Sequence, residues 1–306
     1  SVTQAQGKGI DIKGKEYEQK DLAYSDEGIS INADKIKLSG TGTQANKQIN
    51  LNGAVENSAT IYTKEGIKTK GLTNTGVVQA IKNIEIEGNL LNKGEILTNG
   101  SLTAKDTIST KKLIAKDGIS VGKLENSGKV STAKKLDING NLTNLGNIQA
   151  VENISVTNNV LNKGTILTNG SFTSKDIKNE KELSANKDIT VSKLENIGNI
   201  ASNDKITING VLTNTGELKA LDNIIVSGNT INNGSILTNK NFITKNLNNT
   251  KKLIVKEKID VKNLKNSGTI VSGNKFTVNG NLENTNNLET ENLDVTGNKL
   301  INSGNI

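Results

Sequence analysis

A 70-residue repeat constrains what this chain can fold into more than any other feature of its sequence. The segment NLLNKGEILTNGS at 89–101 returns at 159–171, and again in a looser form at 229–241. A second block recurs with the same offset at 124–128, 194–198 and 264–268. Self-similarity at a fixed period is typical of architectures in which each repeat is stabilised by stacking on its neighbours.

A shorter motif, Leu-x-Asn-x-Gly, divides the 70-residue unit further. Its copies begin at Leu72, Leu90, Leu124, Leu142, Val160, Leu194, Leu212, Thr230, Leu264, Leu282 and Leu300. The spacing between successive copies is 18 or 34 positions, and 34 is twice 17. The spacing therefore predicts four 17- to 18-residue rungs in each 70-residue repeat, with one rung in four lacking the Asn-Gly signature.

Apolar and polar residues alternate within a rung, for example between residues 142 and 156. A period of two is typical of β-strands. Between repeats, Leu102 is replaced by Phe172 and Phe242, so apolar size varies while polarity does not, and we expect these side chains to point inward. Short strands that recur at such close intervals cannot bury a face alone. The predicted fold class is all-β, a right-handed parallel β-helix (solenoid).

Asparagine, with 48 of the 306 residues, occupies one fixed position of the motif. Asn can hydrogen-bond neighbouring backbone groups at a turn, and Asn side chains stacked in register can bond to each other. We therefore predict structural corner positions at Asn74, Asn92, Asn126, Asn144, Asn162, Asn196, Asn214, Asn232, Asn266, Asn284 and Asn302. The glycine two residues later is predicted to supply a positive φ. Base composition could account for the scattered asparagines, but not for this regular spacing.

Seven Asn-Gly dipeptides, including Asn99-Gly100 and Asn139-Gly140, offer a different fold. Each could form a type I′ hairpin turn, which would give an antiparallel repeat. Rungs of the length set by the motif divide more naturally into three short strands and three corners, so the β-helix is favoured over the hairpins.

Residues 1–66 lack the motif and contain all three tyrosines, Tyr17, Tyr24 and Tyr62. Their apolar residues still alternate, so we predict divergent β-rich N-terminal rungs over 1–66, followed by regular repeats over 67–306. The divergent rungs could continue the same helix or form a separate module.

Composition excludes several functional classes. The chain has no His and no Cys, the residues that most often serve general acid–base and thiol chemistry, and we expect no catalytic residues, cofactor or metal. The net charge of +7 comes from Lys spread along the chain, without Arg and with six aromatic residues, which argues against nucleic-acid binding. No apolar run approaches the length of a membrane-spanning helix, and we expect the chain to be a segment of a longer protein.

The full motif GNLTNLGNIQA at 140–150, followed by Ile154 and Val156, resembles the haemagglutinin repeat of filamentous haemagglutinins. Related repeats occur in the exoproteins of contact-dependent growth inhibition. The resemblance covers about residues 67–306, although these rungs are slightly shorter than the family's, and the Asn-Pro motifs of the family's secretion domain are absent. It implies a two-partner secretion exoprotein, exported through an outer-membrane transporter and displayed at the bacterial cell surface, in which such repeats form the shaft.

Three functional hypotheses follow. The first is a rigid shaft that displays adhesive or toxic modules away from the cell. The second is an adhesin module that binds a receptor or glycan on a host or bacterial cell, for which residues 1–66 with their tyrosines are the best candidate. The third is a carbohydrate-active enzyme, which would require clustered carboxylates on one face. The acidic group Glu283, Glu289 and Glu291 has no counterpart in the preceding 70-residue repeat, apart from the nearby Glu217, which argues against an enzyme.

Overall fold

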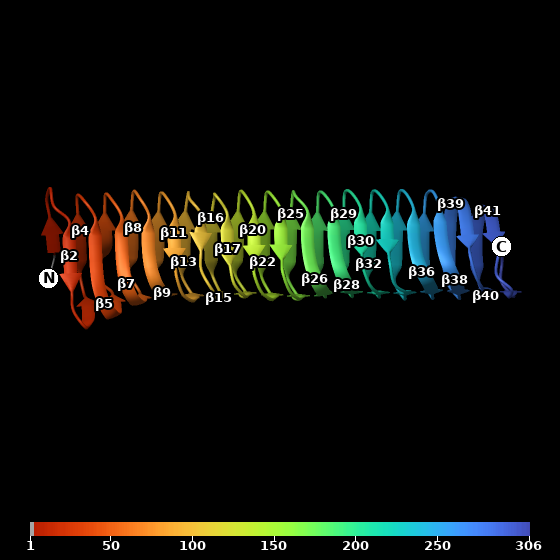
Figure 1. Ribbon diagram of the computed structural model, residues 1–306, viewed down its shortest axis with the longest axis horizontal. Helices are drawn as coiled ribbons and strands as arrows, with labels where there is room; N and C mark the ends of the chain where they lie inside the picture. The colour runs from red at the N-terminus through yellow and green to blue at the C-terminus, as the bar shows by residue number, and fades with distance from the viewer. Residues whose placement is uncertain (1–2) are drawn as a thin grey trace. The chain divides into compact units, whose positions relative to one another are not determined.

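The computed structural model describes residues 3–306, and every regular element in that range is a β-strand. The chain forms two compact units, Ser1–Ser155 and Val156–Ile306. Each unit is a right-handed parallel β-helix whose strands stack rung upon rung (Figure 1). The predicted fold class is confirmed.

Most strands are three or four residues long, and the longer ones bend around a corner to serve two faces. Those that begin in the first unit are β1 (Thr3–Ala5), β2 (Ile10–Lys13), β3 (Glu16–Gln19), β4 (Leu22–Ser25), β5 (Ile29–Leu38), β6 (Gly42–Ala45), β7 (Ile49–Asn57), β8 (Thr60–Thr63), β9 (Ile67–Asn74), β10 (Val77–Ala80), β11 (Ile84–Ile86), β12 (Leu90–Asn92), β13 (Glu95–Thr98), β14 (Leu102–Thr103), β15 (Thr107–Ser109), β16 (Lys112–Ala115), β17 (Ile119–Val121), β18 (Leu124–Asn126), β19 (Lys129–Thr132), β20 (Leu136–Ile138), β21 (Leu142–Asn144), β22 (Asn147–Ala150) and β23 (Ile154–Val156).

The second unit continues with the same pattern of strand lengths. Its strands are β24 (Val160–Asn162), β25 (Thr165–Thr168), β26 (Phe172–Asn179), β27 (Glu182–Ala185), β28 (Ile189–Asn196), β29 (Asn199–Ser202), β30 (Ile206–Ile208), β31 (Leu212–Asn214), β32 (Glu217–Ala220), β33 (Ile224–Val226), β34 (Thr230–Asn232), β35 (Ser235–Thr238), β36 (Phe242–Asn249), β37 (Lys252–Val255), β38 (Ile259–Asn266), β39 (Thr269–Val278), β40 (Leu282–Asn284), β41 (Asn287–Val295) and β42 (Leu300–Asn302).

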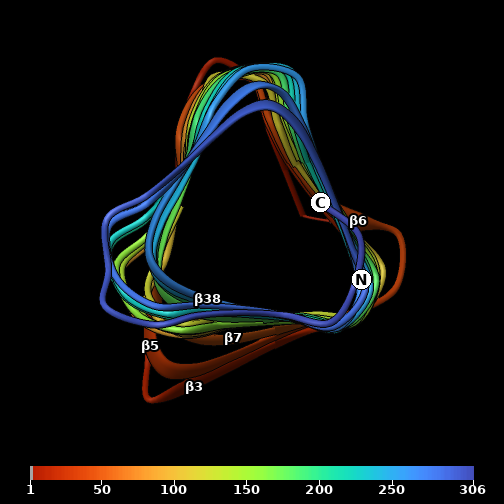
Figure 2. The same cartoon turned by 90° about the vertical axis from the view of Figure 1, so that its right-hand side faces the viewer.

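Three strands make one rung, which gives the three-sided outline of Figure 2. In the first unit, Leu72 pairs with Leu90, Leu90 with Thr107, Thr107 with Leu124 and Leu124 with Leu142. The successive offsets are 18, 17, 17 and 18, which together make one 70-residue repeat. The rung without the Asn-Gly signature is therefore an ordinary rung in register with its neighbours.

The core of each unit is a stack of inward-facing aliphatic side chains. Strand β20 has the burial pattern buried, intermediate, buried, as expected when alternate side chains face the interior. Leu102 in the first unit, and Phe172 and Phe242 in the second, are all 0% exposed. The inward assignment made from the variation in apolar size is confirmed.

The hairpin alternative is wrong. Every strand pairing described within the two units is parallel, for example β18 with β21 and β28 with β31. A type I′ turn requires positive φ at both central residues, and no non-glycine residue of the described range has one. Asn99 and Gly100 instead lie at a corner, directly after β13.

Residues 3–66 form rungs of the first unit's helix and not a separate module. Strand β7 pairs with β9 across residue 66, and Asn57 aligns with Asn74. The N-terminal rungs are longer, since Ile29 pairs with Ile49, and the register between β5 and β7 shifts after Asn32. Their greater length hides them from a search at the spacing of the motif. The strand pairing continues without interruption past the predicted change of rung type at residue 66.

Candidate functional site

The predicted corner asparagines each end a strand of the same face of the rung, the face that carries the Leu-x-Asn motif. Ten of the eleven are at most 2% exposed, and Asn302 is the exposed one. Their side chains therefore point into the interior, which is an expensive place for an amide unless all its hydrogen-bonding groups are satisfied.

These amides satisfy one another along the axis of the helix. In the second unit, Nδ2 of Asn196 donates to Oδ1 of Asn214 at 2.8 Å, and Nδ2 of Asn214 donates to Oδ1 of Asn232 at 2.9 Å. Nδ2 of Asn214 also donates to the carbonyl oxygens of Gly216 and Ser235, both at 3.1 Å. We call this column of amides the asparagine ladder. It joins successive rungs through side chains as well as through backbone.

Three further asparagines belong to the ladder and were missed from the sequence. Asn57 donates to Asn74 at 2.9 Å, Asn179 donates to Asn196 at 2.9 Å, and Asn249 donates to Asn266 at 2.8 Å. The signal that could have found them is the half-way point of the wider spacing, because Asn179 and Asn249 each lie midway between two motif asparagines. In the corresponding rung of the first unit Ser109 takes the place, and Nδ2 of Asn92 lies 3.4 Å from its hydroxyl.

The motif glycines do not have the predicted positive φ. In the described range positive φ is confined to Gly7, Gly40, Gly42 and Gly118, none of which belongs to the motif. The reason for glycine is close approach instead, since a Cβ at Gly216 would overlap the carbonyl oxygen of Gly198 one rung before. Successive turns are packed backbone against backbone at this corner.

A second corner carries an alternation that sequence reasoning also missed. From Ser25 to Ser272 the residue before this corner is buried, at most 4% exposed, and is a hydroxyl residue in every second rung; the alternation ends at Thr290, which aligns with Ser272. The hydroxyl members are Ser25, Thr63, Thr98, Thr132, Thr168, Ser202, Thr238 and Ser272. The members between them are Ala45, Ala80, Ala115, Ala150, Ala185, Ala220 and Val255. The 70-residue repeat thus contains two half-repeats of two rungs each.

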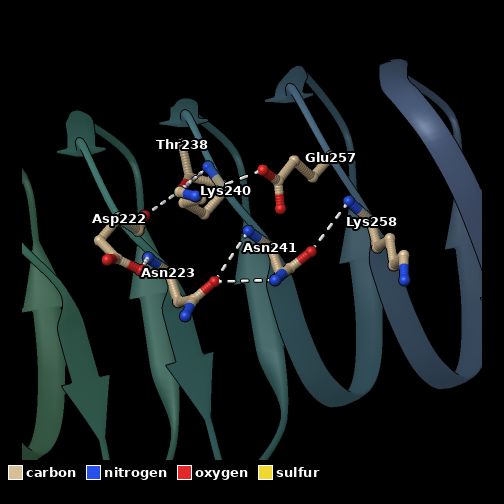
Figure 3. A network of polar contacts seen from close by, with 7 residues as sticks. All are labelled: Asp222, Asn223, Thr238, Lys240, Asn241, Glu257 and Lys258. Carbon is tan, nitrogen blue, oxygen red and sulfur yellow. Dashed lines mark hydrogen bonds and ion pairs between the residues drawn. The ribbon is translucent and has the colours of Figure 1, made fainter.

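Hydrogen bonding explains the alternation at this corner, which we call the hydroxyl corner (Figure 3). After the Ala220 corner, the Asp222 N–H donates directly to the Asp204 carbonyl at 3.1 Å. One rung later, the Lys240 N–H donates to Oγ1 of Thr238 at 3.2 Å, and this hydroxyl donates to the Asp222 carbonyl. A direct bond between turns is therefore followed, one rung later, by a bond relayed through a hydroxyl.

We expect Thr238→Val to destabilise the second unit by about 2 kcal/mol. Valine keeps the shape of the threonine side chain but removes the hydroxyl that links two backbone groups of neighbouring turns. The Lys240 N–H and the Asp222 carbonyl are those groups. Thr238→Ser, which copies the residue at Ser202 and Ser272, should unfold at nearly the wild-type urea midpoint. Equal urea midpoints for the Val and Ser variants would contradict the relay.

Charged side chains lie on the outside and form ion pairs, both across neighbouring rungs and within one rung. Lys240 and Glu257 approach to 3.5 Å at the hydroxyl corner, and their side chains are 51% and 43% exposed (Figure 3). On the asparagine-ladder face, Lys123 lies 2.7 Å from Glu125, whose hydrogen bond raises the pKa of the Lys123 ammonium. Exposed pairs of this kind contribute little to stability. Among residues 3–306, no three His, Cys, Asp or Glu side chains are placed to hold one metal ion.

Shallow grooves follow the bend that precedes the asparagine-ladder face in each unit. The groove of the second unit has a volume of about 460 Å³ and runs past Asn229, Asn246 and Asn263, whose amides form a second, partly exposed column. The equivalent groove of the first unit runs past Asn89, Asp106 and Lys123. Glu283 lines the former groove, whereas Glu289 and Glu291 lie on the exposed strand β41, so the three acids are not brought together in one pocket.

The three tyrosines occupy two different environments. Tyr17 takes an inward position in the register, aligned with the buried Ile36, and burial raises the pKa of its phenol. Tyr24 and Tyr62 are outward residues of β4 and β8. The Tyr24 hydroxyl donates to Oδ1 of Asp26 at 2.7 Å, and this carboxylate raises the pKa of the Tyr24 phenol.

In residues 3–306 no helix is long and apolar enough to cross a membrane. No family model, no curated protein and no solved structure matches the chain.

Proposed function

We propose that this chain is a shaft segment of a secreted bacterial surface protein, and that its β-helix holds adhesive or toxic modules away from the cell. The asparagine ladder carries the proposal. Nine consecutive rungs of the second unit, from Asn162 to Asn302, place an asparagine at this corner. Buried hydrogen bonds that run parallel to the axis oppose bending and shearing of one rung against the next. A mechanical element needs this resistance to bending and shear in every rung, whereas a catalytic site needs reactive side chains in only a few rungs.

The resemblance of the repeats to those of filamentous haemagglutinins suggests how the parent protein is exported and where it acts. We propose that it is exported by an outer-membrane two-partner secretion transporter, that it forms a fibre on the cell surface, and that it meets a receptor on a neighbouring cell. We propose no catalysis, no nucleic-acid binding and no membrane insertion for this segment. The evenly mixed Lys and Glu of its outer surface support a solvated spacer.

A deletion in register tests the shaft. Removal of residues 196–265 joins Glu195 to Asn266 and restores the Leu-Glu-Asn-Ser-Gly corner with four rungs fewer. We expect a cooperatively folded chain whose maximum dimension in small-angle X-ray scattering is shorter by about 19 Å, since each rung advances by ~4.8 Å.

The matched control removes residues 196–274, which is half a rung more and joins Glu195 to Lys275. It should lose the β-structure of the rungs at and after the junction, seen as a smaller circular dichroism signal per residue, because turns would then stack on strands. A maximum dimension that the in-register deletion leaves unchanged would overturn the shaft.

A further inference from the structure

One outward column of the first unit carries no charged residue among the described residues, and tyrosine and glutamine alternate in its N-terminal rungs. On the face formed by β4, β6, β8 and β10, Tyr24 aligns with Gln44, Gln44 with Tyr62 and Tyr62 with Gln79. Aromatic rings and carboxamides thus alternate rung by rung. The two rings lie two rungs apart, which is about 10 Å at ~4.8 Å per rung.

The neighbouring outward column of the same face is also uncharged. It runs from Leu22 to Gly42, then to Thr60 and Val77. Gly42 contributes no side chain between the two tyrosine rungs. From the next rung onward this column becomes charged, with Glu95 followed by Lys112. The two columns are uncharged together over the four rungs from β4 to β10, which contain Tyr24 and Tyr62, and we call this area the neutral strip. The tyrosine column itself continues without charge through Leu97, Ile114, Ser131 and Gln149.

We propose that this strip, with Tyr24, Gln44, Tyr62 and Gln79 as its contact residues, binds a linear, uncharged, β-linked oligosaccharide that lies along the helix axis. A pyranose presents a flat face of C–H groups, which stacks on an aromatic ring, and a rim of hydroxyls that need both donors and acceptors. Tyrosine supplies the first contact with little loss of side-chain entropy, and a glutamine carboxamide supplies both kinds of hydrogen bond. The separation of the rings is close to the length of one disaccharide unit in an extended chain.

The dimensions of the strip favour a glycan over a protein partner. Four rungs of four-residue strands cover on the order of 200 Å², whereas a stable protein interface takes about 800 Å² from each partner. The backbone of β6 is paired on both sides, with β4 and with β8, so an incoming strand finds no free edge here. A neutral ligand also agrees with the eight residues of the two columns, none of which is charged; the Asp26 carboxylate at their edge accepts the hydrogen bond of the Tyr24 hydroxyl.

The test uses cellohexaose and chitohexaose as probes, with the α-1,6-linked isomaltohexaose as a control of the same chemistry but a different shape. Binding is measured by calorimetry and by tyrosine fluorescence in a Tyr17→Phe background, where Tyr24 and Tyr62 are the remaining tyrosines. We expect at least one β-linked hexasaccharide to bind, its tetrasaccharide to bind about tenfold more tightly than its disaccharide, and Kd to be equal at low and high NaCl concentration.

Substitutions locate the site. Tyr62→Ala and Tyr24→Ala should each weaken binding about tenfold, whereas Tyr62→Phe keeps the ring and should bind like the wild type. Ile114→Ala, two rungs beyond Gln79 in the same column, is the matched control and should leave Kd unchanged. Gln44→Ala, judged only after circular dichroism shows a wild-type fold, tests the strip without removing a ring.

The proposal is overturned if neither β-linked hexasaccharide binds at millimolar concentration, if isomaltohexaose binds equally well, or if folded Tyr24→Ala and Gln44→Ala variants keep the wild-type Kd. The shaft deletion lies in the second unit, so the two proposals can fail independently.

Discussion

Asn214→Asp should destabilise the second unit by about 4 kcal/mol at pH 7, the size expected when a buried polar network receives an uncompensated charge. Asn214 is 0% exposed, and its Nδ2 donates to Asn232, Gly216 and Ser235. A carboxylate has no proton to donate to these three oxygens and would face them as a fourth acceptor. Urea unfolding followed by circular dichroism measures the loss.

The pH dependence of this variant has a definite sign. Burial and the surrounding acceptor oxygens favour the protonated carboxyl, so we expect the pKa of the new Asp to be higher in the folded chain than its unfolded value of about 3.9. The destabilisation should therefore be smallest at pH 3, where both states are protonated, and should grow as the pH rises above that unfolded pKa.

Asn209→Asp is the control for charge alone. Asn209 is exposed in the turn before β31, and the same substitution there should change stability by no more than about 0.5 kcal/mol. If Asn214→Asp unfolded at the wild-type midpoint at pH 7, the ladder would not stabilise the rungs.

The fold could be predicted because the same strand pattern recurs in every rung of the sequence. A strand of three residues such as β31 carries almost no signal alone, but Leu212, Thr213 and Asn214 fall into register with equivalent residues throughout the chain. Repetition from rung to rung averages out the ambiguity of each strand. The N-terminal rungs were predicted only as divergent rungs, outside the regular spacing, because the insertion near Asn32 and the longer offset from Ile29 to Ile49 break that register.

The side-chain devices were harder to predict because they depend on which atoms face each other across rungs. The alternation of Ala220 and Thr238 is visible in the sequence, but its meaning appears only when the Thr238 hydroxyl is seen to bridge two turns. Likewise, Tyr24 and Tyr62 are distant in the chain, and only the pairing of both with Gln44 places them in one column. The spacing of the motif in the sequence is enough to predict the length of a rung. The side-chain contacts between rungs can be seen only once the register of neighbouring rungs is known.

A pair of glycine substitutions in the first unit should give effects of opposite sign. Gly94→Ala places a Cβ against the carbonyl oxygen of Gly76 and within 2.9 Å of the Thr75 backbone, so two turns must move apart. Gly71→Ala meets only the Asn89 carbonyl oxygen, at 3.8 Å, which is ordinary contact. Neither glycine has a positive φ, so backbone strain does not distinguish the two sites.

We expect Gly94→Ala to cost about 3 kcal/mol, the upper end of the usual penalty for overpacking, because the atoms in the way belong to the backbone. Gly71→Ala should be neutral or stabilising by up to about 1 kcal/mol, since alanine restricts the unfolded chain. The urea midpoints of the two variants, measured under the same conditions, test whether close approach of the backbone explains the motif glycine. Equal destabilisation of both would show that close approach of the backbone is not what requires glycine at position 94, whereas a loss at Gly94 alone would establish that the motif glycine sets how closely one turn can lie on the next.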